Sequence, residues 1–131
     1  MAGEIERIAT ADAPGPAGHY AQGTAWGGLV FVSGQLGTRP DGTKLTTHPF
    51  AEQARQALAN MLAIASAGGA GPEDFLKVTV YVAGVEHWPE FNAIFAEAFG
   101  EARPARAIVP VPELHHGFLV EVEGVAVRRS D

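Results

Sequence analysis

The sequence predicts an α+β fold in which two helices cover one face of a mixed sheet. Two segments carry apolar residues at helical spacing, and several others alternate apolar and polar residues with the period of two that is typical of strands. Along the chain the order is strands, helix, strand, helix, strands. With 131 residues, of which 47% are hydrophobic and 18% charged, we expect one globular domain over residues 1–131.

Three short segments before the first helix have strand-like composition. Trp26-Gly27-Gly28 suits a hairpin turn between the second and the third of them. Residues 34–47 are rich in Gly and Pro, so we expect an irregular loop there. The expected strands are 5–9, 21–25 and 29–33, with a Pro-, Gly- and Ala-rich loop at 11–19.

Proline begins and glycine ends each expected helix. Pro49 stands where its missing N–H costs nothing, and Gly68-Gly69 ends this first helix. Pro89 and Gly100 mark the ends of the second helix in the same way. The apolar stripes are Ala54, Leu58, Met61, Leu62 and Ala65 in the first helix, and Phe91, Ile94, Phe95, Ala98 and Phe99 in the second.

The remaining strands are expected at 76–83, 105–111 and 118–127. Pro110 and Pro112 indicate that the second of these is an edge strand or contains a bulge. The loop around His115-His116-Gly117 has about the length of a hairpin connection, which favours a hairpin between the last two strands.

The expected strands carry more apolar surface than two helices readily cover. We infer from this that other subunits bury part of the open face of the sheet. The residues behind this interpretation are Val80, Val82, Val120, Val122 and Val127.

Composition excludes several classes of function. A net charge of -6 with scattered basic residues argues against a nucleic-acid partner and against RNA cleavage. The absence of cysteine excludes disulfides, thiolate zinc sites and cysteine nucleophiles. Residues 1–7 do not resemble a signal peptide, and no apolar run approaches the ~20 residues of a membrane span. We therefore expect a soluble, cytoplasmic protein.

The most informative pair of residues is Arg106 and Glu121, which both lie in strand-like segments. If they meet near one cleft, they suit a small substrate that carries its own carboxylate. Arginine would hold that carboxylate with two parallel hydrogen bonds, and glutamate would handle a water or a proton. The alternative for Arg106 is a structural interface arginine paired with a carboxylate.

Several segments resemble the Rid family of reactive intermediate deaminases, the YjgF-like proteins, in order and over nearly the whole chain. The Ser33-Gly34-Gln35 and Pro104-Ala105-Arg106 segments are specific when they occur together. The further matching segments are Gly18-His19-Tyr20-Ala21-Gln22-Gly23, 52–60, 76–82, Phe91-Asn92 and 120–126.

The resemblance implies a chorismate-mutase-like fold, a homotrimer with ligand clefts between subunits, and an activity. That activity is hydrolysis of 2-imino or enamino acids to 2-keto acids and ammonia, without metal or other cofactor. It also implies that Arg106 binds the substrate carboxylate and that Glu121 handles water. The substrate-binding positions implied in the same way are Tyr20, Ser33, Gly34, Asn92 and Arg106.

Each of these residues also has a structural alternative. Tyr20 could serve packing alone, Ser33 could cap a turn, and Asn92 could make a local hydrogen bond. Metal binding is not expected, because adjacent residues on a strand such as His115 and His116 point to opposite sides.

The chain departs from the family pattern at several positions near the expected cleft. Members of the best-known type have proline at the positions of His19 and Gly37, and cysteine at that of Ile108. In the strand after the arginine they favour a further basic residue and then Leu-Pro, whereas this chain reads Pro112-Glu113-Leu114-His115-His116. These changes bear on the substrate range more than on the fold. The alternatives are therefore a Rid-type hydrolase specialised for a catabolic intermediate, or a non-catalytic, trimeric carboxylate-binding or chaperone-like protein.

Overall fold

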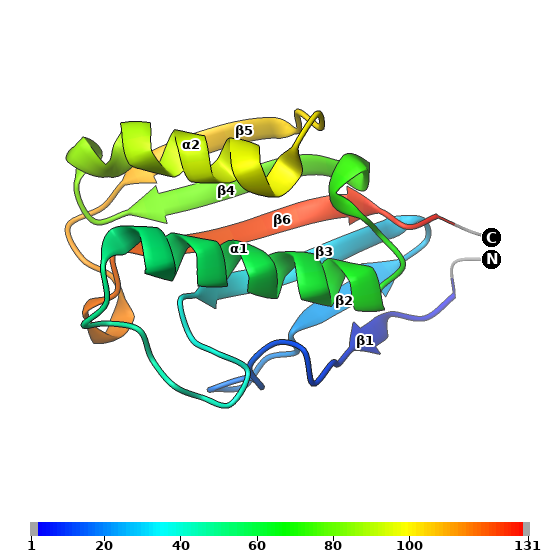
Figure 1. Cartoon of the computed structure of the whole chain (residues 1–131). Coiled ribbons are helices and arrows are strands. Elements are labelled where there is room, and N and C mark those ends of the chain that lie inside the picture. Colours follow the sequence, from blue (N-terminus) through cyan, green and yellow to red (C-terminus); the bar gives the residue numbers. More distant parts are fainter. Residues whose placement is uncertain (1–2, 130–131) are drawn as a thin grey trace.

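The computed structural model describes residues 3–129 and forms one six-stranded mixed sheet with two helices on one of its faces (Figure 1). The α+β class expected from the sequence is confirmed. The strands are β1 (Glu6–Ile8), β2 (Gly23–Trp26), β3 (Leu29–Leu36), β4 (Phe75–Val82), β5 (Ala105–Pro110) and β6 (Val120–Val127). The helices are α1 (Phe50–Ala67) and α2 (Trp88–Phe99).

The strand order across the sheet is β1-β2-β3-β6-β4-β5, and only β4 and β5 pair in parallel. The expected hairpin between the last two strands is wrong, because β5 and β6 pair with opposite sides of β4. The connection instead crosses the end of β4: Val111 donates to the Val82 carbonyl, and Ala83 donates to that of Leu119. The edge position expected for β5 is confirmed.

The helix ends lie where the sequence places them. Pro49 immediately precedes α1, and Gly68 follows it, with Gly69 in the left-handed region at φ +94°. Pro89 lies in the first turn of α2, and Gly100 follows that helix at φ +60°. Among residues 3–129, neither helix is long and apolar enough to cross a membrane.

Strand β3 extends further than expected. Gly34 and Leu36 lie within it, where the sequence predicted a loop. The pairing of β3 with β6 shifts between Val32 and Gln35, so the extra residues form an irregular, bulged stretch of strand. The sequence did not predict a strand here because glycine is uncommon within regular strands, but a bulge accommodates Gly34.

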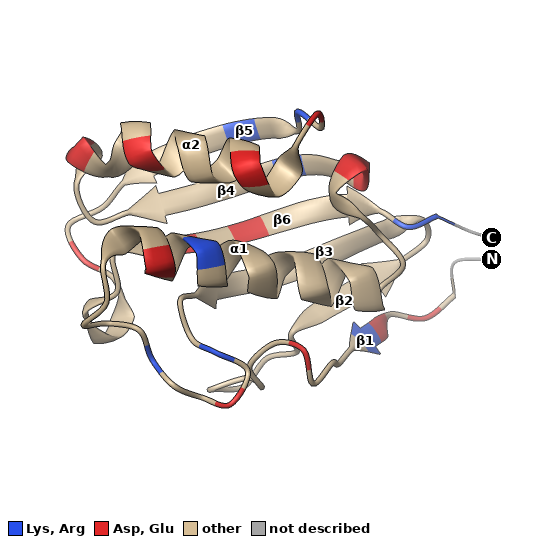
Figure 2. Ribbon diagram, in the orientation of Figure 1, with Lys and Arg blue, Asp and Glu red and all other residues tan. Residues whose placement is uncertain are grey.

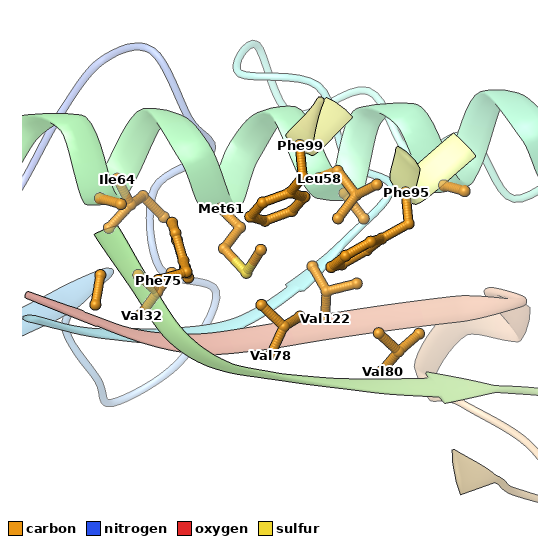
Figure 3. Close-up of a cluster of buried hydrophobic side chains, with 14 of the residues drawn as sticks. Val32, Leu58, Met61, Ile64, Phe75, Val78, Val80, Phe95, Phe99 and Val122 are labelled. Atoms are coloured by element: carbon orange, nitrogen blue, oxygen red, sulfur yellow. The ribbon is translucent and has the colours of Figure 1, made fainter. Parts of the chain in front are cut away.

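The core fills the layer between the sheet and the two helices (Figure 3). The helices alone bury the valines of β4 and the first half of β6 completely, so the interpretation that these valines need other subunits is wrong. Val127 alone of the set lies on the other face. The residues that form this layer include Val78, Val80, Val82, Val120, Val122, Leu58, Met61, Ile64, Phe91, Phe95 and Phe99.

The described part of the chain, residues 3–129, places no second layer over the opposite face of the sheet (Figure 1). Phe31 pairs with Val125 across β3 and β6 on this face and is 44% exposed. Tyr81 of β4 stands beside Glu121 of β6, on the same side of the sheet. Strand alternation therefore places Glu121 on the open face and its neighbours Val120 and Val122 in the core.

Candidate active site

Four of the predicted site residues line one cleft at the edge of the open face, with a volume of about 480 Å³. We call it the Glu121 cleft. Strand β3 contributes Ser33 and Gly34, β6 contributes Glu121, and the loop before β2 contributes Tyr20. The complete lining is Ala17, Gly18, Tyr20, Ser33, Gly34, Leu36, His115, His116 and Glu121.

Glu121 is half-buried in this cleft, between Leu36 of β3 and Tyr81 of β4. Burial raises the pKa of its carboxyl above the ordinary value of 4.5, and the nearby charge of Glu123 acts in the same direction. The positive charge available at His115 partly opposes this increase in pKa. A carboxylate whose pKa is raised in this way is a stronger base than one in water.

Gly34 lies directly against the Glu121 carboxyl group. A Cβ atom at position 34 would overlap Oε2 of Glu121 and lie 3.1 Å from its Cδ. The missing side chain of Gly34 therefore provides the space in which the carboxylate stands.

Tyr20 and Ser33 are held by local hydrogen bonds. The Ser33 hydroxyl donates to the Ala21 carbonyl at 2.7 Å, so its proton is engaged and its free lone pair can only accept. The Tyr20 hydroxyl accepts from the Ala17 amide at 3.1 Å, while the ring is 50% exposed. Both residues line the cleft. The Ser33 bond holds the end of the loop before β2 against β3, and the Tyr20 bond lies within that loop.

His115 and His116 lie in the same cleft, in a one-turn 3-10 helix at His115–Gly117. The assumption that they occupy a strand and point to opposite sides is therefore wrong. Within the described range 3–129, no three His, Cys, Asp or Glu side chains come together in a way that could hold a metal ion.

Arg106 lines a second pocket, which has a volume of about 460 Å³ and lies between β5 and the C-terminal half of α2. Asn92 also lines this pocket, as do Phe95 and Arg103. The Arg106 guanidinium stacks over the Phe95 ring, with Cζ 4.9 Å from the ring centroid. We call this the Arg106 pocket.

Strand geometry keeps the two sites apart within one chain. Arg106 pairs with Val78 of β4, whose side chain enters the core, so Arg106 lies on the helix side of the sheet. Glu121 lies on the open side, and β4 separates β5 from β6. One chain therefore does not bring Arg106 and Asn92 into the cleft that holds Glu121.

The Arg106 guanidinium is available to an anion. Of the ion pairs formed within residues 3–129, none includes Arg106 or Arg103. The alternative of an interface arginine paired with a carboxylate concerns a contact outside the single chain and stays a prediction. Basic and acidic residues are interspersed on the helix-bearing side, with no continuous basic run among the coloured residues of Figure 2.

Other polar residues of the matching segments prove to be buried supports for the cleft. Gln53 of α1 accepts from the Leu119 amide at 2.9 Å, which holds the chain just after His115–Gly117. Asn60 donates to the carbonyls of Leu36 and Thr38, at the end of β3. A side-chain amide on the buried face of a helix gives no sequence signal that separates a structural residue from a ligand-binding residue.

Sequence reasoning missed several residues of the two sites. Ala17, Gly18 and Leu36 carry no chemical signal and could not have been found. Arg103 could have been, because it precedes Arg106 by three residues in a chain with few basic residues.

Comparison with known proteins gives a consistent result. The family model described as Endoribonuclease L-PSP matches residues 10–128. The RutC family protein PH0854 of Pyrococcus horikoshii is 37% identical over 123 residues, covering 94% of this chain and 98% of that protein. The 2-iminobutanoate/2-iminopropanoate deaminase of Dermatophagoides farinae is 36% identical over 120 residues, covering 92% of this chain and 94% of that protein.

A solved structure is similar to this chain over almost its whole length. E. coli TdcF with bound serine matches with a TM-score of 0.89 at 33% identity, covering 95% of this chain and 99% of that one. The chain therefore belongs to the Rid (YjgF-like) family, and the resemblance seen in its motifs is confirmed.

Proposed function

We propose that this protein hydrolyses reactive 2-imino or enamino acids to 2-keto acids and ammonia, at clefts formed between the subunits of a homotrimer. The observation that carries the proposal is the division of the site into two complementary halves. The Arg106 pocket offers a guanidinium that has no anionic partner among residues 3–129, and the Glu121 cleft offers a half-buried carboxyl with a raised pKa. Each half is incomplete alone, and together they match the substrate.

The exposed surface supports assembly of several copies. Phe31 stands on the open face, while Val109 is 37% exposed on the edge strand β5, which carries Arg106. Packing the open face of one copy against the edge of the next would bury these side chains. It would also bring the Arg106 pocket of one subunit toward the Glu121 cleft of its neighbour.

The proposed chemistry uses both halves. Arg106 holds the substrate carboxylate with paired hydrogen bonds, which orients the imine carbon toward Glu121. Glu121 accepts a proton from a water as the water adds to that carbon. An imine carbon is already electrophilic, so we expect no metal or organic cofactor and no covalent nucleophile. Relatives named as 2-iminobutanoate/2-iminopropanoate deaminases support a substrate of this class.

A non-catalytic carboxylate-binding protein is the main alternative. Binding requires Arg106 but has no use for a carboxyl held at a raised pKa beside the ligand. The environment of Glu121 therefore favours an enzyme, including one specialised for a particular catabolic imine.

The test is direct. An amino-acid oxidase generates 2-imino acids in the presence of semicarbazide, and added protein should lower the yield of semicarbazone. Arg106→Ala should abolish this effect while the oligomer stays intact. A lack of effect of the wild-type protein on small, aliphatic, aromatic and basic imines would favour the binding protein.

A further inference from the structure

The histidine pair in the Glu121 cleft is not used by the chemistry described so far. His115 and His116 border the cleft itself, and both also line an adjoining hollow that includes Glu113 and Glu121. Two imidazole groups therefore line the same two hollows as the carboxyl group of Glu121.

The backbone that presents these side chains is strained. Among residues 3–129, His116 is the one non-glycine residue with a left-handed backbone, at φ 60° and ψ 11°. Such a conformation persists only where the surroundings enforce it, and it is concentrated at functional sites.

The surroundings of the turn do enforce this conformation. Gly117 donates to the Leu114 carbonyl at 3.2 Å, and Phe118 donates to that of His115 at 3.1 Å. The buried Phe118 ring lies edge-on to the His116 ring, with centroids 6.2 Å apart. The turn is thus held at both ends while its two imidazoles remain exposed to the cleft.

We propose that His115 is a second proton-transfer residue of the cleft, which protonates the leaving nitrogen while Glu121 acts on the water. This inference rests on the proposed function. Imidazole suits the task because it exchanges a proton near neutral pH more readily than any other side chain.

The steps balance without any oxidant or reductant. Water adds to the carbon of the protonated imine, and Glu121 accepts the proton that the water loses, which gives a neutral carbinolamine. The nitrogen then takes a proton from the His115 imidazolium. The C–N bond breaks as the hydroxyl oxygen closes the carbonyl, ammonia leaves with the bonding pair, and the hydroxyl proton returns to His115. Ammonia finally takes the proton held by Glu121 and leaves as ammonium.

The charged and titratable groups around His115 are consistent with this role. His115 and Glu121 line both the cleft and the adjoining hollow, and a positive charge on His115 partly opposes the increase in the pKa of Glu121 that burial causes. The other groups that face this region are Glu113 and His116 of the same segment, Glu123 of β6, Tyr81 of β4, Tyr20 of the loop before β2, and Lys44 of the loop after β3.

Three variants test the inference. His115→Gln removes the proton donor, and we expect kcat to fall about 10²-fold with little change in KM. The decline in kcat at alkaline pH, where imidazolium is lost, should disappear in the same variant. His116→Asn keeps a residue that tolerates the left-handed backbone and tests the other imidazole of the cleft: whatever its effect on rate, the decline in kcat at alkaline pH should persist in it. His48→Gln changes an exposed histidine outside both pockets and controls for loss of imidazole in general.

Chemical rescue separates proton transfer from structural support. His115→Ala should regain activity when imidazole is added, because a free imidazole can occupy the vacated space and donate the proton. Thermal unfolding would establish that the variants are folded. If a variant at position 115 does not fold, His115→Asn takes its place.

The outcomes are distinguishable. Unchanged kcat and pH dependence in His115→Gln, with Arg106→Ala inactive, overturns the role of His115 and leaves the proposed function standing. Loss of the alkaline limb in His116→Asn alone assigns the proton to the other histidine and also overturns the inference. No turnover by the wild-type protein overturns both proposals.

Discussion

Gly34 of β3 and Glu121 of β6 are in direct contact across the sheet, and the carboxyl of Glu121 occupies the space that a side chain at position 34 would fill. A glycine in a bulged stretch of strand is therefore a requirement of the site, because any Cβ would displace the carboxylate. Burial in this place raises the pKa of the Glu121 carboxyl.

Gly34→Ala should displace the Glu121 carboxyl group and lower turnover about 10²-fold, the usual contribution of a positioned proton-transfer group. Stability should change little, since the overlapping atoms belong to a side chain that can move outward. Kinetics on a 2-imino acid with an uncharged side chain would measure the loss of turnover. Gly28→Ala is the matched control, because a Cβ there meets no atom within 4 Å. Equal rates for the two variants would contradict the positioning role of Gly34.

Glu121→Gln keeps the shape of the side chain and removes its basicity. We expect turnover to slow by about 10²–10⁴-fold while a carboxylate ligand binds as before. In the wild-type protein, kcat should rise with pH as Glu121 ionises, with a midpoint above 4.5 because burial raises its pKa. If Glu121→Gln left kcat and its rise with pH unchanged, another group would have to accept the proton from the water.

The same substitution should affect stability with a defined pH dependence. The native carboxyl of Glu121 holds its proton more tightly than the unfolded chain does, so stability falls as the pH rises from 4.5 through the native pKa. Above both values the ionised carboxyl destabilises the fold, and glutamine lacks this cost. Glu121→Gln should therefore unfold at a higher temperature than the wild type at pH 7. The difference should vanish below pH 4.5, which thermal unfolding across pH would show.

Glycine is required at position 37 because of close packing against α1, and Gly37 does not line the Glu121 cleft. A Cβ there would lie 2.9 Å from the Cα of Gln53 and 3.0 Å from its carbonyl oxygen, both backbone atoms of α1. Gly37→Ala should thus cost about 1–3 kcal/mol of stability, as overpacking usually does. Turnover per folded molecule should remain, and denaturant unfolding would measure the loss of stability. Gly15→Ala, where a Cβ meets nothing within 4 Å, is the control.

Local signals in the sequence predicted local structure well. Pro49 and Gly68 mark the ends of α1 because proline and glycine act through their own backbone. The pairing of β5 and β6 could not be inferred from the length of their connection, because a third strand, β4, lies between them. The face on which Arg106 and Glu121 stand follows from strand alternation, but their separation follows only from the strand order.

The division of the site between Arg106 and Glu121 predicts complementation between inactive subunits. In the proposed homotrimer, assemblies of Arg106→Ala subunits alone or of Glu121→Gln subunits alone should be inactive, yet trimers that contain both kinds of subunit should regain activity. If each cleft takes its arginine from one subunit and its glutamate from the next, every trimer that contains both kinds of subunit keeps one intact cleft, about a third of its clefts. Co-expression with two affinity tags, followed by kinetics on the doubly tagged trimers, would measure the recovery. The matched control is co-expression of the double variant Arg106→Ala/Glu121→Gln with Arg106→Ala, in which every cleft lacks its arginine. Mixed trimers as inactive as this control would mean that both residues of a working site come from one chain.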